Sequence, residues 1–136
     1  MVAFNKFNSY SEAVHHGKHD FSSDQIKVAL TNTAPDAADS VLADIEQIGY
    51  SGLSTRNLVT ASSGQTGGLY KLVLNDLILT QSGIAGQAFR YPVLYNEDAP
   101  SDELIAYYDR GSSITLQPGE SLQLDFSAGS GVLTMI

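Results

Sequence analysis

Three histidines lie close together near the start of the chain and are the first residues to consider as metal ligands. His15 and His19 are four residues apart, which on a continuous helix would place both on one face, at a spacing that can bind zinc. Gly17 interrupts that helix, and Asp20 is the only further ligand nearby. We therefore interpret His15, His16 and His19 as part of a solvated N-terminal turn, and we expect no metal and no other cofactor.

The acidic residues form two groups, at Asp36 and Asp39 and between Glu97 and Glu103. Oxygen-rich loops on β-sandwiches can hold calcium, but neither group has the Asp-x-Asp spacing with a glycine that is typical of a calcium loop. A pair of carboxylates can also hydrolyse a glycosidic bond. The chain is short and has no tryptophan to hold a sugar, so a solvated acidic rim is the better interpretation.

No pattern typical of nucleophilic catalysis is present. The chain has no cysteine, and its paired serines (Ser62-Ser63 and Ser112-Ser113) do not form a Gly-x-Ser-x-Gly elbow. The glycine-rich run from Gly64 to Gly68 lacks the lysine and threonine that end a phosphate-binding loop. We expect that the protein is not an enzyme.

Composition and charge exclude further classes of protein. Of the 136 residues, 43% are hydrophobic and 16% are charged, and the formal net charge is −8. Such an acidic chain is repelled by phosphate backbones and by anionic lipids, so we expect neither nucleic acid nor membrane as a partner. The sequence contains no apolar run long enough to span a membrane, and Met1 to Asn8 does not resemble a secretory signal.

The elements that must position these residues are mostly β-strands. Ser9 to Glu12 fits a capping box and predicts a short helix that ends at Gly17, whereas Val41 to Ile48 fits a helical turn or a strand equally well. Ser62 to Gly68 is predicted to be an exposed loop or hairpin tip, and Pro118-Gly119 the centre of a type II turn. Alternation predicts strands within residues 25–31, 69–79, 89–95, 104–108, 114–116, 121–126 and 132–136, with a weaker one at 56–60.

These elements predict an all-β protein, a β-sandwich or jelly roll of about eight or nine short strands with a short N-terminal helical turn or arm. We assign residues 1–20 to the N-terminal arm and residues 21–136 to a single β-sandwich domain. The two ends of the chain are unusually apolar, with Phe4 and Phe7 at one end and Val132 to Ile136 at the other. Apolar ends of this kind are expected to join a sheet or a neighbouring subunit.

Several segments resemble a family of small structural proteins from tailed bacteriophages and prophages. The most specific are Lys27–Pro35 (KVALTNTAP) and Phe89–Asn96 (FRYPVLYN), and the likeness covers nearly the whole chain. Further matching segments are Phe4–Asn8, Val41–Ile45, Tyr70–Leu74 and Gly111–Leu116. The resemblance implies a head-decoration (cement) protein that binds the outer capsid surface of the virion and stabilises the shell by bridging capsomers.

The resemblance also implies the partners and the place of action. The expected partners are the major capsid protein and further copies of this chain, as a dimer or trimer, on particles assembled in the bacterial cytoplasm. Arg90 and Arg110 are expected to form ion pairs, with Asp109 or Glu97, or to carry a subunit contact. The predicted capsid or oligomer contacts are Phe4, Lys6, Phe7, Arg90, Arg110, Val132, Leu133, Met135 and Ile136.

A different virion role is the alternative. A tail-associated or receptor-binding β-sandwich could recognise glycan on the host surface. Tyrosine-rich strands, with Tyr91 and Tyr95 on one and Tyr107 and Tyr108 on another, would supply the rings on which sugars stack.

Overall fold

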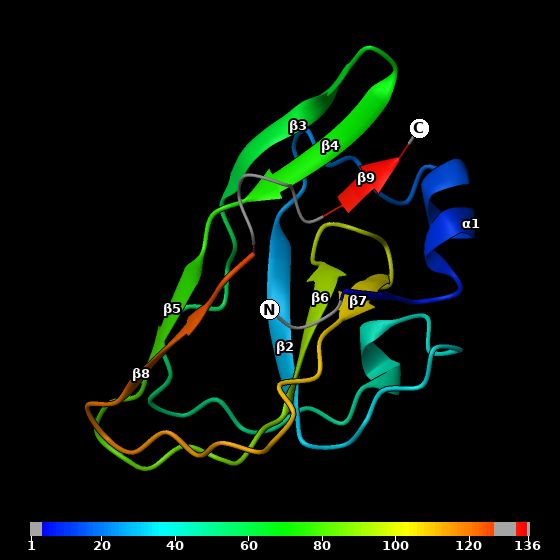
Figure 1. The fold of residues 1–136 in the computed structure, drawn as a ribbon. Helices are drawn as coiled ribbons and strands as arrows, with labels where there is room; N and C mark the ends of the chain where they lie inside the picture. Colours follow the sequence, from blue (N-terminus) through cyan, green and yellow to red (C-terminus); the bar gives the residue numbers. More distant parts are fainter. Residues whose placement is uncertain (1–3, 127–132, 136) are drawn as a thin grey trace.

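The computed structural model describes residues 4–126 and, for the backbone alone, residues 133–135. Within these residues the fold is all-β, with nine short strands, one short α-helix and one 3₁₀ turn (Figure 1). The elements are β1 (Asn5–Lys6), α1 (Tyr10–His15), β2 (Ile26–Thr31), η1 (Leu42–Asp44), β3 (Thr60–Thr66), β4 (Leu69–Leu74), β5 (Leu77–Thr80), β6 (Tyr91–Asn96), β7 (Leu104–Tyr107), β8 (Ser121–Leu124) and β9 (Leu133–Met135).

The strands form a sandwich of two layers. One layer is the antiparallel sheet β1-β7-β6-β2, and the other consists of the sheet β3-β4-β9 followed by the ribbon β5-β8. Between the layers lies the main core, where Val28, Leu30 and Leu94 of the first layer meet Leu72 and Leu79 of the second. The predicted all-β sandwich and its number of strands are confirmed.

The first layer is buried on both faces. Its outer face carries a second core of six buried side chains, namely Phe7, Ala29, Ile45, Val93, Tyr95 and Leu104. Burial on both faces explains why β6 reads as a nearly continuous apolar run rather than an alternating one. The regular β6–β7 pairing ends at Val93 with Tyr107, and next to it Pro92 only accepts, from Tyr108 N at 2.9 Å, because it has no N–H to return the bond.

Residues 4–20, which the sequence assigned to an arm, are part of the body of the sandwich. β1 pairs with β7, opposing Asn5 to Tyr107, and Phe7 and Tyr10 are fully or almost fully buried. Helix α1 ends as predicted, because Gly17 adopts φ +72° and Lys18 N donates to Ala13 O at 2.9 Å.

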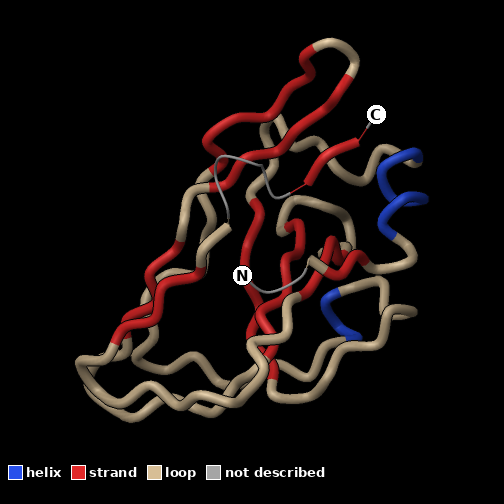
Figure 2. The backbone as a smooth tube through the Cα atoms, in the orientation of Figure 1, coloured by secondary structure: helices blue, strands red, loops and turns tan. Residues whose placement is uncertain are grey.

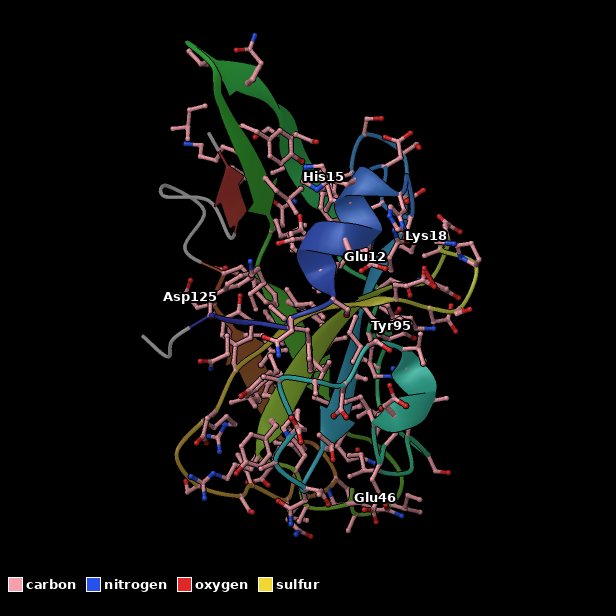
Figure 3. All side chains as sticks on the ribbon, turned by 90° about the vertical axis from the view of Figure 1, so that its right-hand side faces the viewer. Glu12, His15, Lys18, Glu46, Tyr95 and Asp125 are labelled. Carbon is pink, nitrogen blue, oxygen red and sulfur yellow. The ribbon has the colours of Figure 1, made fainter. Side chains whose placement is uncertain are left out.

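The segment from Ser62 to Gly68 is a hairpin with a longer strand than the sequence predicted. β3 begins at Thr60 and continues to Thr66, so only Gly67 and Gly68 remain for the tip. Small polar residues carry no hydrophobic alternation, and pairing with β4 is what makes this segment a strand. The β3–β4 hairpin extends away from the rest of the sandwich in both views (Figures 1 and 3).

The loops gather at the opposite end of the molecule (Figure 2). The predicted turn is found there, with Gly119 at φ +89° and Glu120 N donating to Gln117 O at 2.9 Å. The segment from Val41 to Ile48 combines both of its predicted forms, because the turn η1 is flanked by isolated bridges, Val41 to Glu103 and Gln47 to Thr31.

Candidate contact surface

A hollow of about 300 Å³ lies between the first layer and strand β8. Its floor is apolar because Pro92, Tyr108 and Phe126 turn their side chains between the two layers. The remaining lining residues are Arg110, Leu122, Gln123, Leu124 and Asp125. A hollow of this size can take one or two apolar side chains of a partner, and the arginine adds a polar contact.

Three aromatic rings form a continuous row beside this hollow. Phe4 packs edge to face on Tyr108, with ring centroids 5.9 Å apart, and Tyr108 packs in the same way on Phe126 at 6.1 Å. Edge-to-face contacts hold rings in defined positions. The structure therefore brings two predicted contact residues, Phe4 and Arg110, to one region of the surface, the first through Tyr108 and the second directly.

Arg110 is half-buried at the hollow, and its Nη1 donates to Ser112 O at 2.8 Å. That bond orients the guanidinium, and Arg110 follows Tyr108 by two residues, which places it on the same side of the extended chain. Arg110 is thus the predicted contact residue that lines the hollow, and its contact with a partner stays a prediction.

Arg90 takes part in an internal ion pair instead. Its Nε and Nη2 donate to the two carboxylate oxygens of Asp109 at 2.7 and 3.0 Å. Hydrogen bonds from Arg90, together with one from Gly111 N, lower the pKa of the Asp109 carboxyl. This is the Asp109 pairing that the sequence analysis named, and it commits the fork of Arg90 to its own chain.

Phe7 does not belong to the predicted contact arm, whereas a contact through Lys6 stays a prediction. Phe7 is completely buried in the second core and packs on Tyr107 with ring centroids 5.3 Å apart, so it cannot act as an anchor on a neighbouring molecule. Lys6 is exposed, and its Nζ donates to Ser11 Oγ at 3.1 Å. The apolar character of this end of the chain is thus used to close its own sheet.

The C-terminal residues lie partly outside the described part of the chain. β9 pairs antiparallel with β4, with Leu133 opposite Leu72 and Met135 opposite Tyr70. This pairing is the sheet-closing role that the sequence analysis considered for the C-terminal segment. Val132 and Ile136 fall outside the described residues.

His19, predicted from the sequence to lie in a solvated turn, is half-buried, and its Nε2 is fully buried. Its ring packs against those of Tyr10 and Phe21, at centroid distances of 5.5 and 5.3 Å, in a cluster of three rings, and its Nδ1 lies 3.0 Å from Asn96 Nδ2. Burial lowers the pKa of His19, and the charges of Glu103 and Asp24 oppose that shift more weakly. In the sequence, the nearby aromatic residues Tyr10 and Phe21 were the signal that the His19 ring could pack against other rings.

The network around His19 determines which of its nitrogens carries the proton. The Asn96 amide oxygen accepts from Asp98 N at 3.0 Å. The Asn96 amide nitrogen, Nδ2, is therefore the atom that faces His19 and Asp24. Nδ1 of the neutral ring is then an acceptor, and the proton is on Nε2, which is buried without a partner among the described residues.

The carboxylates of both acidic groups accept hydrogen bonds from backbone N–H groups. Asp39 accepts from Asp36 N at 3.0 Å, Asp98 accepts from Gln25 N at 2.8 Å, and Glu103 accepts from Ser101 N at 2.7 Å. Among residues 4–126, no three His, Asp or Glu side chains gather as a metal site. Glu12 and His15 lie on the surface of α1 (Figure 3).

The tyrosines considered for sugar binding are largely committed to the fold. Tyr95 and Tyr108 are buried, at 4% and 8% exposure, and Tyr107 packs on Phe7. Sugar stacking needs an exposed ring face, so these positions give little support to the glycan-binding alternative.

Comparisons with protein-family models, with curated proteins and with solved structures found no match in any of the three. Within the part of the chain that the structure describes, no helix has the length and apolar character needed to cross a membrane.

Proposed function

We propose that this chain is a non-enzymatic structural protein of a tailed-phage particle, a head-decoration protein that binds the major capsid protein on the outer surface of the shell. The observation that carries the proposal is the resemblance of Lys27–Pro35 and Phe89–Asn96 to that family. The two segments form the adjacent strands β2 and β6, so the resembling residues include the centre of the first layer.

The hollow beside Arg110 supports a contact role. It combines an apolar floor with the cation of Arg110 and the carboxylate of Asp125, so an amide-rich loop with an apolar tip is the complementary partner surface. Repetition of a modest contact over many symmetric lattice sites would give the shell a large total stabilisation.

Arg110→Glu provides the test of this surface, with Lys18→Glu as its matched control. Both substitutions change the charge by the same amount, and Lys18 is exposed in the loop after α1, away from the hollow (Figure 3). Heads of the parent phage prepared without this protein are mixed with each variant, and bound protein is measured by co-sedimentation. We expect Arg110→Glu to weaken binding by about tenfold or more, equivalent to about 1.4 kcal/mol, and Lys18→Glu to bind like the unmodified chain.

Cryo-electron microscopy of the same particles tests the location. Decoration requires density at symmetric positions on the outer shell. Density on the tail alone, or equal binding by the two variants, would contradict the proposed head contact.

A further inference from the structure

The outer edge of β3 is open in the described part of the structure. In the sheet β3-β4-β9 this strand pairs on one side only, with β4. From Ser62 to Thr66 the pairing with β4 is regular, and all but one of these five residues are exposed. Such an edge presents unpaired backbone N–H and C=O groups that can accept another strand.

The edge lacks the features that usually prevent strand pairing. Proteins protect exposed edges with charged side chains, prolines or bulges. β3 contains no charge and no proline, and its one irregularity lies between Thr60 and Ser62, before the regular stretch begins. The regular stretch is therefore free to pair.

The charge distribution indicates which kind of strand fits. Residues 57–70 carry no charged side chain, and the one charge in the β3–β4 hairpin is the cation of Lys71, opposite Gly64, although the whole chain has 15 acidic and 7 basic residues. Two copies of so acidic a protein repel each other over most of their surface. Contact between the two β3–β4 hairpins avoids that repulsion, because no carboxylates meet there and the hairpins hold the two bodies apart (Figures 1 and 3).

We propose that β3 pairs antiparallel with β3 of a second copy, which forms a continuous six-stranded sheet across a two-fold dimer. A two-fold axis makes such a contact self-complementary. With Gly64 at the axis, Ser63 lies opposite the second copy's Gln65 and Ser62 opposite its Thr66, so small polar residues meet throughout. The same register brings the exposed Val59 of each copy toward the tip of the other hairpin, where Leu69 is exposed. This inference does not depend on capsid binding.

Gly64 is the position at which to test this dimer. A Cβ added at Gly64 meets no atom within 4 Å, so larger side chains fit the single chain without strain. Gly64→Glu would place two carboxylates opposite each other at the axis, whereas Gly64→Gln has nearly the same shape without the charge. Gln65→Glu is a second variant, and it keeps the side-chain oxygen that accepts from Gly68 N at 2.9 Å.

Sedimentation equilibrium over a range of protein concentrations measures the dissociation constant directly. We expect a concentration-dependent dimer for the unmodified chain and for Gly64→Gln, and a dissociation constant raised about tenfold or more by Gly64→Glu and by Gln65→Glu. Circular dichroism and thermal unfolding of each variant confirm that the monomer fold is retained. A monomer at all concentrations, or a dimer that both glutamate variants leave unchanged, would overturn the proposal.

Salt provides an independent readout of the same contact. Screening shortens the Debye length from about 30 Å at 0.01 M to about 8 Å at 0.15 M, which weakens repulsion between the acidic bodies but does not affect a neutral strand pair. The dimer should therefore tighten as salt rises. If salt weakened the dimer, ion pairs would hold it together, and the proposed pairing of the two β3 edges would be contradicted. Arg110→Glu should dimerise as the unmodified chain does, so the dimer and the head contact can fail separately.

Discussion

At the residue scale, Phe7 shows how an apolar end of the chain is used by the chain itself. Its ring is completely buried in the second core, between the first layer and the segment that contains η1. Only tertiary structure distinguishes a core phenylalanine of this kind from an exposed one that binds another molecule, because the sequence pattern is the same in both cases. Phe4 next to it remains half-buried on Tyr108.

Phe7→Ala should therefore destabilise the fold strongly. Removal of a fully buried phenylalanine costs about 3–5 kcal/mol, through lost transfer free energy and the cavity that remains. Phe4→Ala, at a half-buried ring, serves as the control and should cost clearly less. Urea unfolding followed by tyrosine fluorescence measures both, and equal costs would contradict the packing described for Phe7.

His19 should make the stability of the fold depend on pH. Its pKa in the folded state lies below the ordinary value of 6.5, so the unfolded chain takes up the proton first as the pH falls. This contribution to stability is present above pH 6.5 and is lost as the pH falls through the folded-state pKa.

His19→Phe keeps a ring in the cluster with Tyr10 and Phe21 but cannot titrate. Between pH 7.5 and pH 5, the unmodified protein should lose more free energy of unfolding than this variant loses. Thermal unfolding at a series of pH values gives the comparison. If the free energy of unfolding fell equally with pH in both proteins, the lowered pKa of His19 would be contradicted.

At the scale of elements, one buried side chain joins the loops at the end opposite the hairpin. Gln81 is 2% exposed, and its Nε2 donates to Ser51 O at 2.7 Å and to Ile84 O at 3.0 Å. The backbone carbonyl of Gln81 accepts from Gly119 N at 2.7 Å. Gln81, which follows β5, thus bonds to three separate segments, to two through its side chain and to one through its backbone.

Gln81→Ala should destabilise the protein by about 1–3 kcal/mol, because it removes two hydrogen bonds worth about 0.5–1.5 kcal/mol each. Gln123→Ala is the matched control, since Gln123 is exposed and donates to Asp76 Oδ2 at 3.0 Å. Hydrogen exchange should report faster opening around residues 51 and 84 in Gln81→Ala alone. Equal exchange in the two variants would contradict the role assigned to Gln81.

The sequence predicted those elements whose own residues carry the signal. Alternating apolar residues identified β2 and β4, Pro118-Gly119 identified its turn, and Gly17 identified the end of α1. The extent of β3 could not be predicted, because small polar residues form a strand there only through their partner β4.

The candidate site was predicted in part for the same reason. Arg110 could be singled out because it is one of three arginines and lies beside an apolar strand. The hollow beside it is formed by residues from β6 and β8, which are far apart in the sequence. Sequence patterns give no information on which distant segments come together, and Arg90 could not be separated from Arg110 without that information.

At the scale of the whole molecule, the two proposed contact surfaces lie on different elements. The head contact uses the hollow beside β8, whereas the dimer contact uses the edge of β3. A two-fold dimer would double the number of head contacts on each particle-bound unit, and binding of one half would raise the effective concentration of the other. Loss of the dimer alone should therefore weaken head binding without abolishing it.

The pairing of β1 with β7 affects how the chain is made. Asn5 and Tyr107 are neighbours in the sheet although 102 positions separate them in the sequence, as the bond from Asn5 Nδ2 to Tyr107 O illustrates. During translation β1 has no partner until β7 has been synthesised. The apolar ring of Phe7, which packs on Tyr107 in the folded chain, consequently stays exposed to solvent until then.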